Sequence, residues 1–177
     1  STNEIALDDL KFVVGPGQTL ALKGAVTNNS TIRLDDTSAN ASNAAVLQLD
    51  GSSPTGTGTL FFSSANQNRV TAVGVSTLTA NQTITTESAG DKGDVQAGLV
   101  NEGLISAVTG TIDLSTTAKT NNGTISALNG GRIEVSSIHV DNTNGVIDVD
   151  GTSSLGLENG STILGGQISG TGTIDQT

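Results

Sequence analysis

The chain has 177 residues, and seven Lys and Arg residues against 17 Asp and Glu residues give it a formal net charge of −10. This acidic balance argues against binding to nucleic acid or to anionic membrane surfaces. The sequence has no cysteine, which excludes disulfides and thiolate metal sites, and no apolar run long enough to cross a bilayer. Because it begins at Ser1 without an initiator methionine, we expect a processed chain or a piece of a longer protein.

The N-terminal half is predicted to contain short strands at irregular spacing. Residues 1–14 combine apolar residues with charges at Asp8, Asp9 and Lys11, and we expect a cap or a docking strand there. Four further segments alternate apolar and polar residues and are expected to be strands, namely 19–22, 31–34, 46–49 and 59–62. Their spacings of 12, 15 and 13 residues fit no single coil length.

Two polar segments are expected to leave the regular structure as loops. They are residues 35–45 and 87–98, which are rich in Gly, Ser, Asn and Asp and lack apolar periodicity. Loops carry binding sites more often than regular elements do, although a solvated insertion without a partner is the alternative for each.

From Asn101 to Asp175 the sequence repeats itself about every 21 residues. One apolar column, with spacings of 20, 22 and 21, consists of Ile105, Ile125, Ile147 and Ile168. A second column, with spacings of 21, 22 and 19, consists of Ile112, Ile133, Leu155 and Ile174. Around both columns apolar and polar residues alternate, so we expect short strands whose apolar side chains point inward. A period in this range indicates stacked supersecondary units.

Asparagine and glycine separate these strands, and we expect them to supply positive φ angles at sharp corners. The corner segments are Asn121-Asn122-Gly123, Asn129-Gly130-Gly131 and Asn144-Gly145. Strands joined by such corners form one coil, and the next coil lies parallel to it about 4.8 Å along the axis. The predicted fold is an all-β, right-handed parallel β-helix with about 21 residues per coil, in which residues 1–177 form a single domain.

The repeat phrases resemble those of large bacterial surface adhesins. The phrases that carry the resemblance are residues 100–105, 121–128 and 165–174, with Gly56-Thr57-Gly58-Thr59-Leu60 as a further example. They are similar to autotransporter passenger domains and filamentous-haemagglutinin-like exoproteins. The resemblance covers about two thirds of the chain and implies a β-helix that is secreted or held at the bacterial cell surface. Since the chain has no Arg-Gly-Asp motif, the resemblance names no receptor.

Acidic residues in the second loop and in the repeats are candidate calcium ligands, because Ca²⁺ prefers oxygen donors. The candidates are Glu87, Asp91 and Asp94 in the loop, together with Asp113 and Glu134, which are expected on adjacent coils. Neither an EF-hand spacing nor a calcium-binding nonapeptide is present, so solvated carboxylates are the alternative. No other cofactor is expected.

No catalytic residue is predicted. Asp148 and Asp150 are expected on one outward strand face, at a spacing that glycosidic acid and base pairs use, but the chain has no Trp or Tyr to stack on a sugar ring. His139 is the only histidine, and it is expected to be an ordinary surface residue.

The expected function is that of a non-enzymatic, extracellular structural or adhesive module of a bacterial surface protein or filament. The alternatives are a subunit of a self-assembling surface array or phage fibre, and a carbohydrate-active β-helix enzyme. The expected partners are other copies of the chain or adjacent coils of a longer chain, and host or surface glycans. The sequence identifies no ligand-binding residues beyond the calcium candidates.

Overall fold

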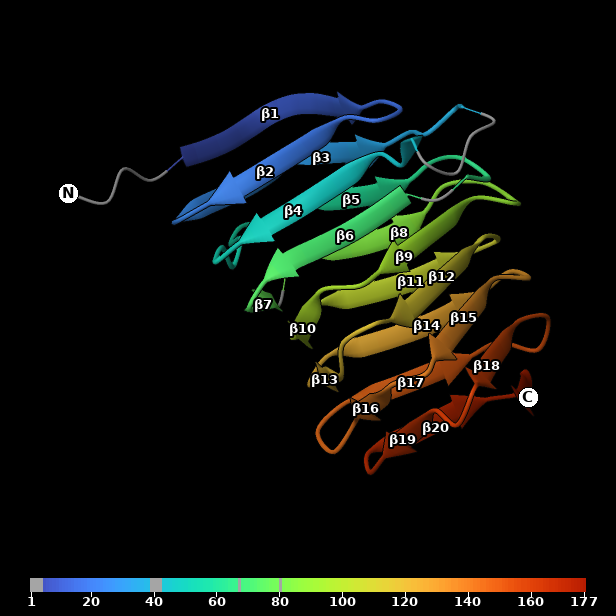
Figure 1. The fold of residues 1–177 in the computed structure, drawn as a ribbon. Coiled ribbons are helices and arrows are strands. Elements are labelled where there is room, and N and C mark those ends of the chain that lie inside the picture. The colour runs from blue at the N-terminus through green and yellow to red at the C-terminus, as the bar shows by residue number, and fades with distance from the viewer. Residues whose placement is uncertain (1–4, 39–42, 67, 80) are drawn as a thin grey trace.

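The computed structural model describes residues 5–38, 43–66, 68–79 and 81–177, and these residues form β-strands and no α-helix. The strands belong to three parallel sheets that wind into a β-solenoid of about eight turns (Figure 1). The predicted fold class is therefore confirmed.

Two long sheets form the main walls. Sheet 1 has the order β1 (Ile5–Val14), β3 (Val26–Leu34), β5 (Thr59–Phe62), β8 (Thr83–Thr86), β11 (Leu104–Val108), β14 (Thr124–Leu128), β17 (Val146–Val149) and β20 (Gln167–Gly170). Sheet 2 has the order β2 (Thr19–Lys23), β4 (Val46–Asp50), β6 (Asn68–Val73), β9 (Lys92–Val95), β12 (Thr111–Ser115), β15 (Arg132–Ser136), β18 (Ser154–Glu158) and β21 (Thr173–Gln176). The shorter sheet 3 contains β7 (Val75–Leu78), β10 (Gly98–Asn101), β13 (Lys119–Asn121), β16 (His139–Asp141) and β19 (Thr162–Leu164).

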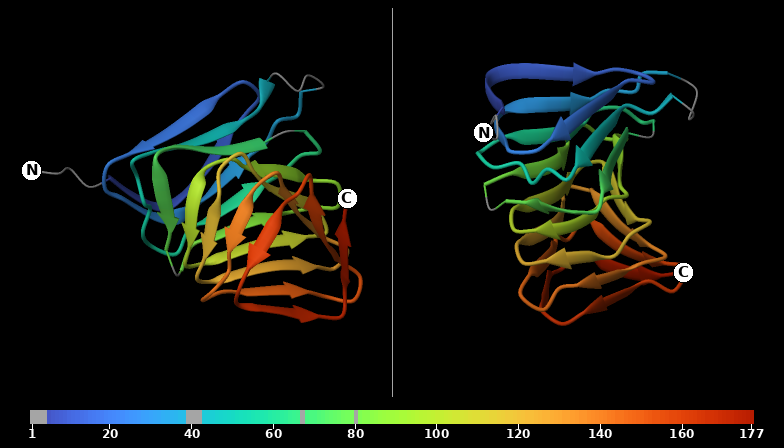
Figure 2. Two further views of the ribbon diagram at one scale, coloured as in Figure 1. Left: turned by 60° about the horizontal axis from the view of Figure 1, so that its bottom comes forward. Right: turned by 60° about the vertical axis from the view of Figure 1, so that its left-hand side comes forward.

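Each coil runs from sheet 1 to sheet 2 and, from β7 onwards, returns through sheet 3. The strands of sheet 2 lie in front in Figure 1 and run opposite to those of sheet 1 behind them, while the chain descends from one coil to the next. Figure 2 shows the same path from the C-terminal end, where the three sheets enclose the core. The winding is right-handed, as parallel crossovers favour.

The first predicted column stacks in register through the later coils. Ile105, Ile125 and Ile147 are paired in successive strands of sheet 1 and are at most 2% exposed. Ile168 continues the column in the last coil, where it is 43% exposed because no described coil covers it. The burial predicted for this column is therefore confirmed except at its end.

The second column behaves in the same way. Ile112, Ile133 and Leu155 are buried in sheet 2, while Ile174 in the last coil is 52% exposed. The irregular spacing in the N-terminal half also has a simple cause. The four segments predicted there are strands that alternate between sheet 2 and sheet 1, so their separations measure parts of a coil.

The expected role of the corner residues is only partly confirmed. Asn129 and Gly130 adopt positive φ angles of 54° and 87°, whereas Gly123 does not. Gly123 is required for another reason, because a Cβ atom there would lie 2.3 Å from the backbone oxygen of Gly103 in the preceding coil.

The expected loop over residues 87–98 is corrected by the structure. Residues Lys92–Val95 form β9 and Gly98 begins β10, so this segment stays within the stack. The sequence pattern did not indicate a strand here, because Gly93 takes an inward position that is normally occupied by an apolar side chain. In the segment 35–45, residues 35–38 and 43–45 contain no strand, and residues 39–42 lie outside the described part. Of residues 1–14, the described part from Ile5 onwards is β1, the first strand of sheet 1.

Candidate functional site

Three of the five calcium candidates lie in one row on the outer face of sheet 2. Asp94, Asp113 and Glu134 are register partners on β9, β12 and β15. Period-two alternation turns them outward because their chain neighbours fill the core. They line a surface hollow of about 250 Å³, together with Lys92, Gly93 and Thr111. We call these three carboxylates the acidic row.

The carboxyl group of Asp113, in the middle of the acidic row, has a raised pKa. Burial raises its pKa to about 6, the hydroxyl of Ser136 opposes the rise, and the charges of Asp94, Glu134 and Glu158 add to it. One carboxylate oxygen of Asp113 is buried without a hydrogen-bond partner. This carboxyl group therefore changes charge close to neutral pH.

Arg132 neutralises the C-terminal continuation of this row. Its guanidinium donates to Glu134 at 2.7 Å and to both carboxylate oxygens of Asp175, at 3.0 and 3.2 Å, and lies 3.5 Å from Glu158. The contact with Asp175 spans two coils and passes over Gly156, where a Cβ atom would lie 2.2 Å from a guanidinium nitrogen. The unneutralised charge is thus concentrated at Asp94 and Asp113.

The other two calcium candidates lie elsewhere and have structural partners. Glu87 forms an ion pair with Arg33 and accepts a hydrogen bond from Ser63. Asp91 is buried, and its carboxylate accepts the backbone N–H groups of Glu87 and Ser88 at 3.1 and 2.6 Å. The five residues therefore do not form one cluster. Among the described residues, no three acidic or histidine side chains are placed to hold a metal ion, so calcium binding at the acidic row stays a prediction.

A lysine interrupts the core column of sheet 3. Lys119 is paired between Leu99 and Val140 and is only 4% exposed. Its ammonium donates to the backbone oxygens of Ser115, at 2.8 Å, and of Thr117. Burial lowers the pKa of Lys119 to about 8, against the opposing charges of Asp94 and Asp113. The protein thus keeps a cation in an apolar column where two carbonyl groups can bind it.

A ladder of asparagine side chains joins the coils at the corner between sheets 3 and 1. Asn101 donates to the side-chain oxygen of Asn121, and Asn121 donates to that of Asn142, both at 2.7 Å. All three side chains are at most 2% exposed. Because each amide also donates to a backbone oxygen of the next coil, the ladder satisfies buried polar groups that the turn would otherwise leave unpaired.

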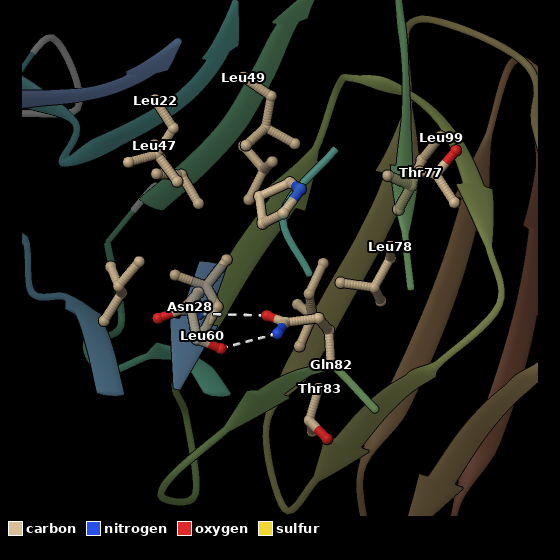
Figure 3. Close-up of a pocket in the computed structure, with 14 residues that line it drawn as sticks. Leu22, Asn28, Leu47, Leu49, Leu60, Thr77, Leu78, Gln82, Thr83 and Leu99 are labelled. Carbon is tan, nitrogen blue, oxygen red and sulfur yellow. Dashed lines mark hydrogen bonds between the residues drawn. The ribbon is translucent and has the colours of Figure 1, made fainter. Parts of the chain in front are cut away.

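An internal cavity of about 30 Å³ lies among the early coils, where sheet 3 begins (Figure 3). Its lining is mostly apolar. At its edge the side-chain amide of Gln82 accepts a hydrogen bond from the Asn28 side chain at 3.1 Å and donates one to the backbone oxygen of Asn28 at 2.9 Å. This volume is large enough for about two water molecules and too small for an organic ligand. The cavity lies where the third sheet joins the coils, at β7.

Asp148 and Asp150, the two carboxylates considered for catalysis, do not lie on one strand. Asp148 is within β17 and accepts the hydroxyl of Ser169, but Asp150 lies beyond the strand. Its carboxylate accepts hydrogen bonds from Asn129, Thr152 and Ser153. These donors lower the pKa of Asp150, and its carboxylate therefore stabilises the turn that follows β17. His139 is exposed, as expected, and contacts Thr162.

Sequence reasoning placed Arg132 near Glu134, but it missed Lys119 and the asparagine ladder. One signal was present for the ladder, since Asn101, Asn121 and Asn142 are spaced by 20 and 21 residues, the period of the apolar columns. Lys119 also lies at this period, 20 residues after Leu99 and 21 before Val140, but a charged residue in an apolar column is not expected to point inward.

No protein-family model, curated protein or solved structure matches this chain. In the ranges that the structure describes, no helix has the length and apolar character needed to cross a membrane. Fold and surface therefore define the class of this protein, which is a right-handed parallel β-solenoid with an acidic outer row.

Proposed function

We propose that this chain is an extracellular structural and adhesive module, a β-solenoid rod in a bacterial surface protein or filament, without a catalytic role. The observation that carries the proposal is the unbroken column from Ile84 to Ile168 through five successive strands of sheet 1. Each coil packs on the previous one through backbone hydrogen bonds and apolar contacts, so the stacked coils form an extended and stiff rod.

The outer face of sheet 2 supports the adhesive part of the proposal. Beside the acidic row lies a second outward row of hydroxyl and cationic side chains, consisting of Lys92, Thr111, Arg132, Ser154 and Thr173. Repeated donors and acceptors at the coil spacing suit a repetitive polar partner, such as a glycan, whose hydroxyl groups donate and accept hydrogen bonds.

Antibody labelling of the source cells tests the location. We expect antibodies against the chain to label intact cells, and labelling only after permeabilisation would contradict the proposal. Beads coated with the chain test adhesion, and we expect them to bind glycan-coated surfaces. Beads that carry the double variant Asp113→Asn/Glu134→Gln should bind less, while a Lys23→Gln control on the same sheet should bind equally.

A carbohydrate-active enzyme is the second candidate, and Asp113 is the observation that favours it. A carboxyl group with a raised pKa, beside other carboxylates in a hollow, has the character of a general acid. Incubation with a panel of polysaccharides, followed by assay of new reducing ends, tests this candidate. Activity that is lost in Asp113→Asn and kept in Asp148→Asn supports it, and the absence of product with the native chain rejects it.

A further inference from the structure

Three Asn-Gly pairs lie in corners that have a described coil on either side. They are Asn122-Gly123 between β13 and β14, Asn129-Gly130 between β14 and β15, and Asn144-Gly145 between β16 and β17. In such a pair the main-chain nitrogen of the glycine can attack the side-chain amide of the asparagine, because glycine has no side chain that hinders the approach. The three pairs have the same local chemistry, so any difference in their reactivity comes from the fold.

The reaction is a deamidation that needs only water. The glycine nitrogen gives up its proton and forms a bond to Cγ of the asparagine, while the bond from Cγ to the amide nitrogen breaks and that nitrogen leaves with the proton as ammonia. Water then opens the cyclic imide at one of its two carbonyl groups, which gives aspartate or isoaspartate. A hydrogen bond from the glycine N–H slows this reaction, since it must be broken before the nitrogen can attack.

The Asn122-Gly123 pair is free to react. The N–H of Gly123 makes no hydrogen bond with the residues that the structure describes. Asn122 is exposed, and the Nδ2 atom of Asn144 lies 3.5 Å from its Oδ1 atom, which is the outer limit of a hydrogen bond. The main chain is fixed, because the N–H of Asn122 donates to the backbone oxygen of Asn101 at 2.8 Å. The side chain can therefore turn towards a nitrogen that stays in place.

The other two pairs are protected by their glycine nitrogens. The N–H of Gly130 donates to the hydroxyl oxygen of Ser153 at 3.0 Å. The N–H of Gly145 donates to the backbone oxygen of Asn142 at 2.9 Å, and Gly145 is buried. Each of these nitrogens has to give up a hydrogen bond before it can attack the asparagine that precedes it.

We propose that Asn122 is a site of spontaneous deamidation in the folded protein, through a cyclic imide with Gly123, and that the isoaspartate product loosens the corner between β13 and β14. Isoaspartate adds one carbon atom to the main chain. The corner has no room for it, because a Cβ atom on Gly123 would already lie 2.3 Å from the backbone oxygen of Gly103. On the other side Asn121 is held in the asparagine ladder. The longer main chain must therefore displace contacts to the neighbouring coils.

Incubation of the purified 177-residue chain in warm, mildly alkaline buffer tests the site. After denaturation, trypsin cleaves at Lys119 and Arg132, so the peptide 120–132 carries both Asn122 and Asn129. Mass spectrometry locates each deamidation, and enzymatic methylation detects isoaspartate. We expect Asn122 to react about tenfold faster than Asn129 and Asn144, since one hydrogen bond is worth about that factor in rate. The same chain incubated in urea should lose this difference.

A serine variant tests the cause of the protection. Ser153→Ala frees the N–H of Gly130, so deamidation of Asn129 should accelerate towards the rate of Asn122 while Asn122 itself is unchanged. The matched control is Ser154→Ala, because the hydroxyl of Ser154 contacts Arg132 and should leave the rate at Asn129 as it is. Circular dichroism verifies that both variants are folded.

Equal rates at Asn122 and Asn129 in the folded chain overturn the inference. So does an Asn122 that stays intact in the folded chain while the chain in urea reacts to completion. Thermal melting tests the effect on the corner, and we expect an aged chain rich in isoaspartate to melt at a lower temperature than the fresh chain. Asn122→Asp, which adds no main-chain atom, should melt close to the fresh native chain. An aged chain that melts like the fresh one contradicts the loosening of the corner.

Discussion

The ring of Phe62 occupies the space where a side chain at position 93 would stand, and a Cβ atom on Gly93 would lie 2.0 Å from the ring. Phe62 comes from sheet 1 and is fully buried, while Gly93 belongs to sheet 2 in the next coil. In later coils the sizes are reversed, with the small Ala107 on sheet 1 and the large Ile112 on sheet 2. The core thus keeps its volume by exchanging bulk between opposite walls.

This relationship predicts compensation between the two positions. Gly93→Ile should destabilise the protein by about 3 kcal/mol or more through overpacking, and Phe62→Ala by about 3–5 kcal/mol through the cavity it leaves. The double variant Phe62→Ala/Gly93→Ile should lose less than the sum of the two, since it adopts the arrangement of the later coils. Urea unfolding of all four proteins measures this coupling, and strictly additive losses would show that the two residues do not share one space.

The asparagine ladder predicts that alanine substitutions at two neighbouring asparagines differ greatly in their effect on stability. Asn121→Ala removes a fully buried side chain that links Asn101 to Asn142, leaving their amide groups without that partner. We expect a loss of about 2–4 kcal/mol. The exposed Asn122 is the matched control, and Asn122→Ala should change stability by less than about 0.5 kcal/mol. Equal thermal shifts for the two variants would contradict a structural role for the ladder.

Replacement of the buried lysine should stabilise the protein at neutral pH. The folded-state pKa of Lys119, about 8, lies below the ordinary lysine value of 10.5. The unfolded chain therefore binds more protons between these values, and native stability rises with pH across this window. Lys119→Met removes the buried charge, so we expect a gain of about 1–2 kcal/mol at pH 7 that shrinks towards pH 10.5. The control Lys92→Met, at an exposed position, should show neither effect.

Urea midpoints for these lysine variants, measured from pH 7 to pH 10.5, decide the matter. A Lys119→Met variant that is less stable than the native chain at pH 7 would mean that the two carbonyl contacts outweigh the cost of burying the ammonium.

The acidic row predicts a stability change at lower pH. The folded-state pKa of Asp113, about 6, lies above the ordinary aspartate value of 3.8, so the native protein binds more protons between these values. Its stability therefore falls as pH rises through this window. Asp113→Asn should be more stable than the native chain by about 1–2 kcal/mol above pH 6, with the difference vanishing below pH 4.

Asp141→Asn provides a control of opposite sign. Hydrogen bonds from Thr143 lower the pKa of the exposed Asp141 carboxyl group, so its removal should slightly destabilise the protein at neutral pH. Thermal melts of both variants from pH 3 to pH 8 test the pair, and a shift in the same direction for both would contradict the assigned causes.

Calcium binding at the acidic row is tested by its effect on melting temperature. Ca²⁺ that binds only the folded chain should raise the melting temperature by a few degrees at millimolar concentration. The shift should disappear in Asp113→Asn/Glu134→Gln, whereas Mg²⁺ at equal ionic strength controls for screening. No shift in the native chain, or an equal shift in the double variant, rules out a stabilising calcium site in this row.

Sequence periodicity by itself determined the solenoid and the register of its regular part. The columns of Ile105 and Ile112 could be predicted because a buried strand face demands alternation, and stacked coils demand a constant period. The row of Asp113 and Glu134 followed from the same register, since the two residues occupy equivalent positions in successive coils.

Only the tertiary structure decided the features that depend on contacts across the coil. A glycine at position 93 gave no strand signal, because the bulk that fills its place comes from Phe62 on the opposite wall. Lys119 reads as a surface residue until its pairing with Leu99 turns it inward, where backbone carbonyl groups from a nearby corner bind its charge. Local pattern specifies which residues alternate and repeat. Which side chains share space across the interior depends on coil width and corner geometry, and these are set by all the coils packing together.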